Sequence, residues 1–281
     1  MSGYEALPPL FRLIARRLTA NDFKVHTGYW LTGDPTMEKV GPDGALKYGN
    51  LGDASYTYRV DTYGKIFGLT RQDVINDDLG AFLEIPRMIG RGAALAIEDA
   101  GWTLVLANTG SYFATGNNNY IEGAGTVLGS AGLGSAIEKL LKQTDRNTKP
   151  ILLEGKYLVV PPELKVTADE LYQSTNINTG GSSTTTKVPN RNIFAGKYEP
   201  VAVPYLSNSG YTGYSTTAFY VFPDPQNVAA FGLAFLNGAE QPTVEEVDQP
   251  AEFLGTAFRG YIDFGACQVD PRGGVKSKGA A

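Results

Sequence analysis

Between two β-prone runs lies a stretch of the chain that has almost nothing to bury. The runs are "KVHTGYWL" (24–31) and "ASYTYRVDTYGKIFGL" (54–69), and the second begins with a clear alternation of its two faces. Residues 32–53 between them are rich in glycine and poor in core-forming side chains. A loop of this length is unusual within a compact domain and is often functional. We therefore expect a long, extended hairpin whose tip reaches away from the body.

A helical pattern follows this hairpin. From Leu79 the apolar residues recur in steps of three and four, at Phe82, Leu83, Pro86, Ile89, Ala93, Ile97, Ala100 and Leu104. Roughly 20 helical residues span about 30 Å, so the pattern predicts a long rod for a chain of this size. Pro86 either kinks this helix or opens a second one at its first position.

Two adjacent carboxylates, Asp77 and Asp78, stand at the expected start of this helix. Asn76 or Asp77 is a good N-cap, and both acids would lie at the positive end of the helix dipole. A catalytic acid pair needs a cleft and a separation set by the tertiary structure, which adjacent residues rarely supply. We interpret the two carboxylates as a cap or an intersubunit ion pair, with metal binding or catalysis as the alternative.

Charged residues are scarce in this chain. They make up 19% of the sequence against 42% hydrophobic residues, so we expect part of the surface to be hidden against partners. The net charge of −5 provides no basic field for nucleic acid. The single cysteine, Cys267, excludes an internal disulfide and fits a reducing compartment. We find neither a signal peptide nor an apolar run of about 20 residues, and we expect a soluble protein made in the cytosol.

Shorter patterns predict the remaining elements. Residues 4–23 form an amphipathic segment with Leu10, Leu13, Ile14 and Leu18 on one helical face, packed either on its own domain or, as an arm, on a neighbour. Thr167 and Glu170 predict a capping box for a short helix. A further helix is expected at 135–144, a polar loop at 174–197, two strands about Glu154-Gly155 in 151–160, and strands at 198–206, 217–225 and 253–270.

Candidate sites for chemistry are weak. His26 is the sole histidine, which excludes a multi-histidine zinc site; it lies in a strand-like run beside aromatic residues, with a triad as the alternative. Cys267 has no CxxC partner and fits a small buried side chain. "GAGTVLG" (123–129) lacks the Lys-Ser/Thr of a P-loop and the preceding strand of a dinucleotide fold. We predict no catalytic residue, no metal site and no cofactor.

Several stretches of the sequence resemble one protein family. They are "RLTANDF" (17–23), "DTYGKIFGLTRQDVINDDLGAF" (61–82), "KPILLEGKYLVVPPELKVTADELYQS" (149–174) and "VEEVDQPAEFLGTAFRGYIDFGACQVDPRGGVKSKG" (244–279). These blocks resemble the Mu-like phage major head subunit family, whose shell proteins are similar to the HK97-like capsid fold. The resemblance covers nearly the whole chain in order. It is weaker in the glycine-rich passage before residue 134 and in the loop 174–197.

The resemblance implies an α+β fold with the parts of a shell subunit. These parts are an N-terminal arm (1–23), an extended loop that reaches a neighbouring subunit (24–70), a peripheral domain with a long spine helix (71–121 and 251–281), and an axial domain (122–250). Residues 174–197 would then form the tip that gathers around the five- and six-fold axes.

The resemblance also implies a function. It indicates a major capsid protein of a tailed double-stranded DNA bacteriophage, not an enzyme, that self-assembles into pentamers and hexamers of an icosahedral head. Its implied location is the virion capsid, assembled in the host bacterial cytoplasm. The implied partners are copies of itself, scaffold and portal proteins, and in some shells a decoration protein. DNA is enclosed without sequence-specific binding, and no membrane is involved. Some members carry an upstream protease or scaffold segment that is removed.

Charged residues in the regions implied to touch neighbours are the candidate intersubunit contacts. They are Glu38, Lys39, Asp43, Lys47, Arg71, Asp77, Asp78, Arg259 and Arg272. Each exposed ion pair contributes little, about 0–1 kcal/mol, so we expect many copies of a large interface to stabilise the shell. Related shells sometimes crosslink a loop lysine, and Lys39 and Lys47 lie in the corresponding region, where solvated charges are the simpler interpretation.

Two other functions remain open from the sequence. One is a hydrolase that uses Asp77, Asp78 and a bound metal. The other is a monomeric β-rich module that binds a host or a carbohydrate, which the 16 tyrosines suggest.

Overall fold

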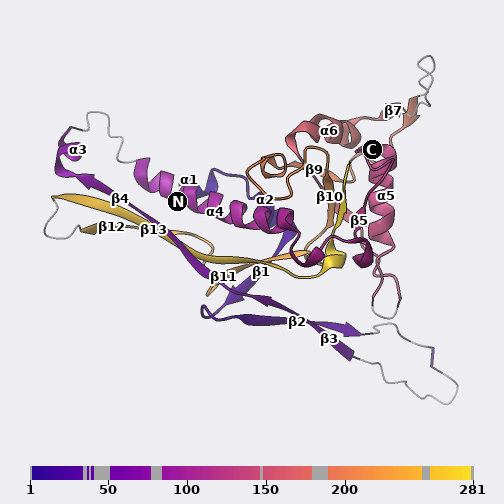
Figure 1. Ribbon diagram of the computed structural model, residues 1–281, viewed down its shortest axis with the longest axis horizontal. Helices are drawn as coiled ribbons and strands as arrows, with labels where there is room; N and C mark the ends of the chain where they lie inside the picture. The colour runs from indigo at the N-terminus through magenta and orange to yellow at the C-terminus, as the bar shows by residue number, and fades with distance from the viewer. Residues whose placement is uncertain are drawn as a thin grey trace.

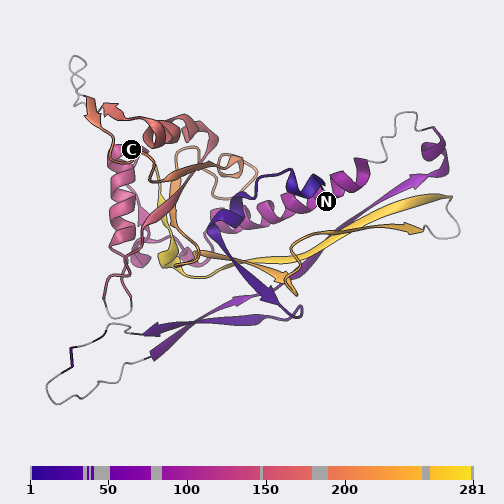
Figure 2. The same cartoon turned by 180° about the vertical axis from the view of Figure 1, so that it is seen from behind.

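The computed structural model describes residues 2–33, 37, 39–40, 51–76, 84–145, 148–178, 189–248 and 254–279. Figure 1 shows an elongated molecule with a body at one end, which holds α5 and α6, and a long sheet with helix α4 that extends to the other end. A separate ribbon, β2 (His26–Gly33) paired with β3 (Leu51–Tyr58), projects below this sheet. The view from behind shows the same ribbon below the sheet (Figure 2), and β3 contacts β13.

The first sheet is built around one long strand, β13 (Gly255–Gln268). Its first ten residues pair with β4 (Asp61–Thr70) on one side, and part of the same stretch pairs with β12 (Thr243–Asp248) on the other. Its last residues pair with β11 (Phe231–Leu236), which is joined in parallel by β1 (Ala15–Ala20). The far end of the sheet is therefore three strands wide, and α3 (Arg71–Ile75) follows β4 there.

Helix α4 (Ile85–Ala107) lies along one face of this sheet (Figure 1). Pro86 stands in its first turn, where the missing N–H costs nothing, and Asn108 ends it in the left-handed conformation at φ 46°. The second role considered for Pro86, the start of a helix, is therefore the observed one. Ile89 of the predicted apolar stripe is buried over Gly260, where a Cβ atom would lie 2.0 Å from the Ile89 side chain.

The N-terminal segment packs along α4 of its own chain rather than leaving it. Helices α1 (Ser2–Glu5) and α2 (Leu10–Ile14) contact α4, and the Phe11 ring lies so close to Gly101 that a Cβ atom there would be 2.4 Å away. The single amphipathic helix expected through Leu18 is wrong beyond Ile14. From Ala15 the chain becomes β1, because pairing with β11 satisfies its backbone groups.

The second sheet has both faces buried. Its strands lie in the order β5 (Tyr120–Ile121), β14 (Val275–Ser277), β10 (Phe219–Pro223), β6 (Gly155–Val160) and β9 (Glu199–Ala202). Tyr220 and Phe222 face a core shared with α4 and the first sheet, whereas Phe219 and Val221 face a second core. Since successive strand residues point to opposite faces, this one sheet serves two cores. α5 (Ser130–Leu141) and α6 (Lys165–Gln173) cover the second core.

Two local expectations in the body are wrong. Thr167 lies inside α6, which begins at Lys165 directly after the turn η4 (Pro162–Leu164), so it does not cap the helix. The two strands expected in 151–160 are one, β6, because Leu152 has φ 58° and cannot continue a strand. The short strands β7 (Asn176–Asn178) and β8 (Pro189–Arg191) pair with each other at the edge of the body. None of the helices in the described ranges is long and apolar enough to cross a membrane.

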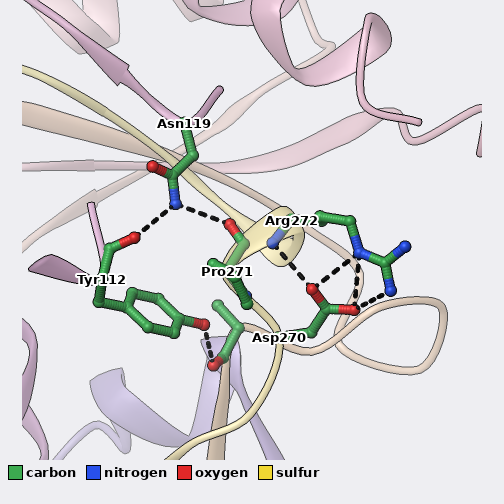
Figure 3. Close-up of polar contacts among 6 residues, drawn as sticks. Tyr112, Asn119, Asp270, Pro271 and Arg272 are labelled. Carbon is green, nitrogen blue, oxygen red and sulfur yellow. Dashed lines mark hydrogen bonds and ion pairs between the residues drawn. The ribbon is translucent and has the colours of Figure 1, made fainter. Parts of the chain in front are cut away.

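The chain crosses from the first sheet to the second directly after β13. The crossing is a short turn, η6 (Pro271–Gly273), preceded by the buried Asp270. The Asp270 carboxylate accepts a hydrogen bond from the Arg272 backbone N–H at 2.9 Å and from its guanidinium at 2.6 Å (Figure 3). The Asp270–Arg272 pair therefore fixes the shape of the turn.

Asn119 holds this crossing from the other side. Its fully buried amide nitrogen donates to the Tyr112 carbonyl at 2.9 Å and to the Pro271 carbonyl at 2.8 Å (Figure 3). Its amide oxygen accepts from the Ala114 N–H at 2.9 Å, and its backbone carbonyl accepts from the Lys276 N–H at 2.9 Å. Asn119 therefore joins the loop after α4 to the crossing turn and to β14.

We expect Asn119→Ala to lower the free energy of unfolding by about 2–4 kcal/mol, because it leaves buried backbone groups without partners. The measurement is chemical denaturation of the purified protein. Asn227→Ala, at an exposed position, is the control and should change stability by about 0.5 kcal/mol or less. Equal effects of the two variants would contradict the role of Asn119.

Candidate assembly interfaces

The ribbon carries a ladder of aromatic rings across its two strands. His26 stacks on Tyr58 at 5.4 Å between ring centroids, Tyr58 on Tyr56 at 6.0 Å, and Tyr56 on Trp30 at 5.6 Å. The Tyr58 hydroxyl donates to the Thr19 carbonyl at 3.0 Å, which ties the root of the ribbon to the body. The ladder keeps the two strands in register where the chain leaves the body.

Trp30 stands at the inner side of this ribbon, above a cleft. Its indole nitrogen is buried and has no hydrogen-bond partner among the residues that the structure describes. Arg16 and Tyr56 also line this cleft, as do Asp270 and Arg272 of the crossing turn. The ribbon root is therefore placed directly against the junction of the two sheets.

His26 has a structural environment. Its Nε2 lies 3.0 Å from a carboxylate oxygen of Asp22 and 3.1 Å from the Asp22 carbonyl, and its ring stacks on Tyr58. This arrangement holds the turn between β1 and β2. It agrees with the interpretation of His26 as a structural residue.

An apolar groove lies between α4 and the outer half of the first sheet. Its volume is about 450 Å³, and Tyr63, Phe67, Met88, Leu95 and Tyr261 line it. The Met88 side chain is 60% exposed. Exposed apolar surface of this kind makes the groove a candidate for a protein contact.

The candidate ion-pair residues do not form one cluster in the described part of the chain. Glu38, Asp43, Lys47, Asp77 and Asp78 lie outside the described residues. Lys39 is exposed.

The structure describes the side chains of the three remaining candidates, Arg71, Arg259 and Arg272. These three residues lie in separate parts of the molecule. Arg71 is exposed at the far end of the first sheet, where its backbone N–H donates to the Leu254 carbonyl at 2.9 Å. The Arg259 guanidinium contacts Glu245 of its own chain at 2.8 Å, and Arg272 is held by Asp270.

Sequence reasoning missed a buried carboxylate on α4. Glu98 is 5% exposed and accepts hydrogen bonds from the Phe11 backbone N–H at 2.9 Å and from the Trp102 indole N–H at 2.8 Å. Burial raises the pKa of Glu98, and these hydrogen bonds and the nearby Arg12 offset part of the shift. Glu98 therefore fixes the start of α2 on α4. The sequence pattern that could have indicated this contact is an acidic residue four positions before a tryptophan in an apolar helix.

The cysteine and the glycine-rich stretch that the sequence offered as candidate sites do not form a reactive or ligand-binding site in the described structure. Cys267 is buried, and burial raises the pKa of its thiol to about 12, so it is not a reactive thiolate at neutral pH. In the glycine-rich stretch 123–129, Gly123 and Gly125 adopt positive φ in a loop that precedes α5. Within the described residues, no group of three or more metal-ligating side chains comes together.

The sequence profile of the phage capsid proteins matches residues 54–277 of this chain. The chain belongs to the phage capsid protein family. No curated protein matches this capsid protein.

Solved structures of phage proteins are similar to it over nearly their full length. The capsid structure of the cyanophage P-SCSP1u has a TM-score of 0.61 and 15% identity, and the match covers 95% of this chain and 86% of that one. A structure from Microbacterium phage Oxtober96 has a TM-score of 0.56 and 9% identity, with 92% and 84% covered. One from Gordonia phage Cozz has a TM-score of 0.55 and 13% identity, with 97% and 87% covered.

These findings confirm the main predictions. The α+β capsid fold is confirmed by the structural matches, and the function as a major capsid protein of a tailed phage by the family match. The narrower resemblance to the Mu-like head subunits stays a prediction, as do the domain boundaries and the intersubunit ion pairs.

Glu98 predicts a pH dependence. Because its pKa is raised in the folded state, protonation favours folding; this contribution is complete below the ordinary value of 4.5 and is lost as pH rises through the folded pKa. We therefore expect Glu98→Gln, which does not titrate, to gain stability relative to the wild type as pH rises above the ordinary value of 4.5. Denaturation at several pH values measures the difference, and a pH-independent difference would contradict the prediction.

Proposed function

We propose that this capsid protein assembles into the pentamers and hexamers of an icosahedral head that encloses double-stranded DNA. The supporting observation is its shape: the ribbon and the outer half of the first sheet leave the body in different directions (Figures 1 and 2). Both carry strongly exposed apolar side chains, such as Tyr29 on the ribbon and Ile75 and Leu254 at the far end of the sheet. Such surface is unfavourable in an isolated subunit and is covered when copies associate.

The predicted parts can be assigned as a proposal. Residues 1–23 form the arm, 24–70 the extended loop, 71–121 with 251–281 the peripheral domain, and 122–250 the axial domain. The sheet pairings cut across these ranges: β11 and β12 belong to the first sheet, and β14 belongs to the second. Each sheet therefore contains strands from the range assigned to the peripheral domain and strands from the range assigned to the axial domain.

The remaining partners follow from the same proposal. Scaffold and portal proteins, and a decoration protein on some shells, would bind the assembled head in the host bacterial cytoplasm. The net charge of −5 gives the chain no general attraction for DNA, so the packaged genome is enclosed without tight or sequence-specific binding. A strongly basic inner surface in an assembled shell would contradict this. The protein acts as a structural subunit and not as an enzyme.

We expect the purified protein to form rings of five or six copies, or closed shells, because its projections are covered only by neighbours. Size-exclusion chromatography with light scattering measures the mass, and negative-stain imaging shows the particle shape. A monomer that stays monomeric with its scaffold present would contradict the proposal. An Asp77→Ala/Asp78→Ala variant that assembles normally but loses a hydrolytic activity of the wild type would favour the hydrolase.

The Arg259–Glu245 pair allows a sharper test of the proposed intersubunit contacts. Both side chains are exposed, so Arg259→Gln should leave the thermal midpoint of the free subunit nearly unchanged. If Arg259 also contacts a neighbour, the same variant should raise the concentration needed for assembly. Lys142→Gln, which breaks an exposed pair with Glu138 on α5, is the matched control. If both variants need the same concentration for assembly, Arg259 does not contact a neighbouring subunit.

A further inference from the structure

Helix α4 contains three glycines, and close packing within the chain explains two of them. A Cβ atom at Gly90 would lie 3.2 Å from the Tyr4 backbone nitrogen. One at Gly101 would lie 2.4 Å from the Phe11 ring. The third glycine, Gly92, is exposed, and a Cβ atom there would meet no other described atom within 4 Å. The packing of the described residues therefore gives no reason for a glycine at position 92.

A glycine at this place weakens the helix. Gly92 lies in the interior of α4, away from both ends, where glycine is a poor helix former because it loses the most conformational freedom on folding. Its missing side chain also leaves an opening in the surface of α4. The close approach of another molecule at this opening would account for the glycine.

Gly92 lies between two exposed apolar side chains on one face of α4. Met88 is four residues before it and Leu95 three residues after it, and residues at these spacings are neighbours on a helix surface. The two side chains are 60% and 43% exposed, and both line the apolar groove between α4 and the first sheet. α4 thus presents two projecting side chains with a gap between them. A second helix packs on such a surface by placing one of its own side chains in the gap.

The groove has a basic border. Arg91 is exposed and lies three residues after Met88, on the same face of α4. Lys65 of β4 lines the groove on the side of the sheet, and its ammonium lies 5.4 Å from the Phe67 ring centroid. Neither Arg91 nor Lys65 forms an ion pair with any residue that the structure describes. Two unpaired cations beside an apolar groove favour a partner with negative charge.

A second copy of α4 fits this groove poorly. Two copies packed face to face about Gly92 would bring their Arg91 side chains together, and like charges repel. Of the other helices longer than eight residues in the described ranges, α5 and α6 carry one large exposed apolar side chain each, Leu141 and Val166. Neither helix therefore supplies a matching pair of apolar side chains, and the groove favours a helix from a different protein.

We propose that the groove between α4 and β4 binds an amphipathic helix of another protein, with Gly92 at the point of closest approach. The bound helix carries apolar side chains in steps of three and four, one of which enters the gap between Met88 and Leu95. Acidic side chains beside this stripe meet Arg91 and Lys65. The proposal goes beyond the assembly of identical copies and does not depend on it.

A display library of helical peptides tests the chemistry of the partner. Each peptide carries a fixed stripe of leucine and alanine at helical spacing and random residues at the flanking positions, and binders are selected on the purified full-length protein. The selected peptides should be enriched in Asp and Glu at the flanks, and their affinity, measured by fluorescence anisotropy, should fall as salt is raised. Absence of a binder, or enrichment of Lys and Arg, would overturn the proposal.

Two glycines give a matched pair of variants. Gly92 and Gly116 are both exposed, and a Cβ atom at either would meet no described atom within 4 Å. We expect Gly92→Leu, which fills the gap on α4, to weaken binding of a selected peptide by roughly tenfold or more, and Gly116→Leu to change it less than about twofold. Gly92→Leu should keep or raise the thermal midpoint of the wild type, because leucine is a better helix former than glycine.

Reversal of one charge tests the basic border. Arg91→Glu should weaken binding of a peptide with acidic flanks by roughly tenfold and strengthen binding of the same peptide with lysines at those positions. Lys197→Glu makes the same change of charge at an exposed position in the body and is the control. Equal effects of the two variants would show a general charge effect and would overturn the site.

Other occupants of the groove give different results. A lower thermal midpoint of Gly92→Leu would show that the chain itself fills the groove, for which residues 77–83, outside the described residues, are at hand. If Gly92→Leu leaves peptide binding unchanged but raises the concentration needed for assembly, the groove is a contact between copies. Either result would overturn the proposal, and neither would remove the capsid function.

Discussion

The passage of the chain from β13 into β14 is the constraint on which the rest of the subunit depends. One continuous segment supplies the central strand of the first sheet and an inner strand of the second. The turn between them contains the buried carboxylate of Asp270, and the buried amide of Asn119 binds the carbonyl of Pro271. Buried polar groups are tolerated only when they are paired, so this geometry fixes how the two sheets meet.

A second consequence of this arrangement concerns cooperativity. Alternate side chains of β6 and β10 lie in two different cores. Unfolding of either core would therefore expose these strands and destabilise the other core as well. The N-terminal segment adds to the first core through Phe11, whose N–H is held by Glu98. The body of the subunit is thus one packed unit from which the ribbon and the outer sheet project.

The sequence predicted the elements whose residues repeat regularly and missed those decided by distant partners. Steps of three and four located α4, and the alternation in 54–62 located the ribbon strand β3. The role of Asn119 depends on Pro271, 152 residues away, and that of Glu98 on Phe11, 87 residues away, so no local pattern reports them.

The errors also have local physical causes. Residues 15–20 have apolar positions that suit a helix, but pairing with β11 decides their conformation. The left-handed Leu152 shortens the expected strand pair to β6 alone.

The length of β13 has a mechanical consequence. At about 3.3 Å per residue, its 14 residues form a beam of about 45 Å that is anchored beside β11 and β1 and is thin at its far end. A beam of this length converts a rotation of about 5° at its root into a displacement of about 4 Å at its tip. Small changes of packing beside the root would therefore alter the angle between neighbouring copies, and with it the curvature that a surface built from many copies can adopt.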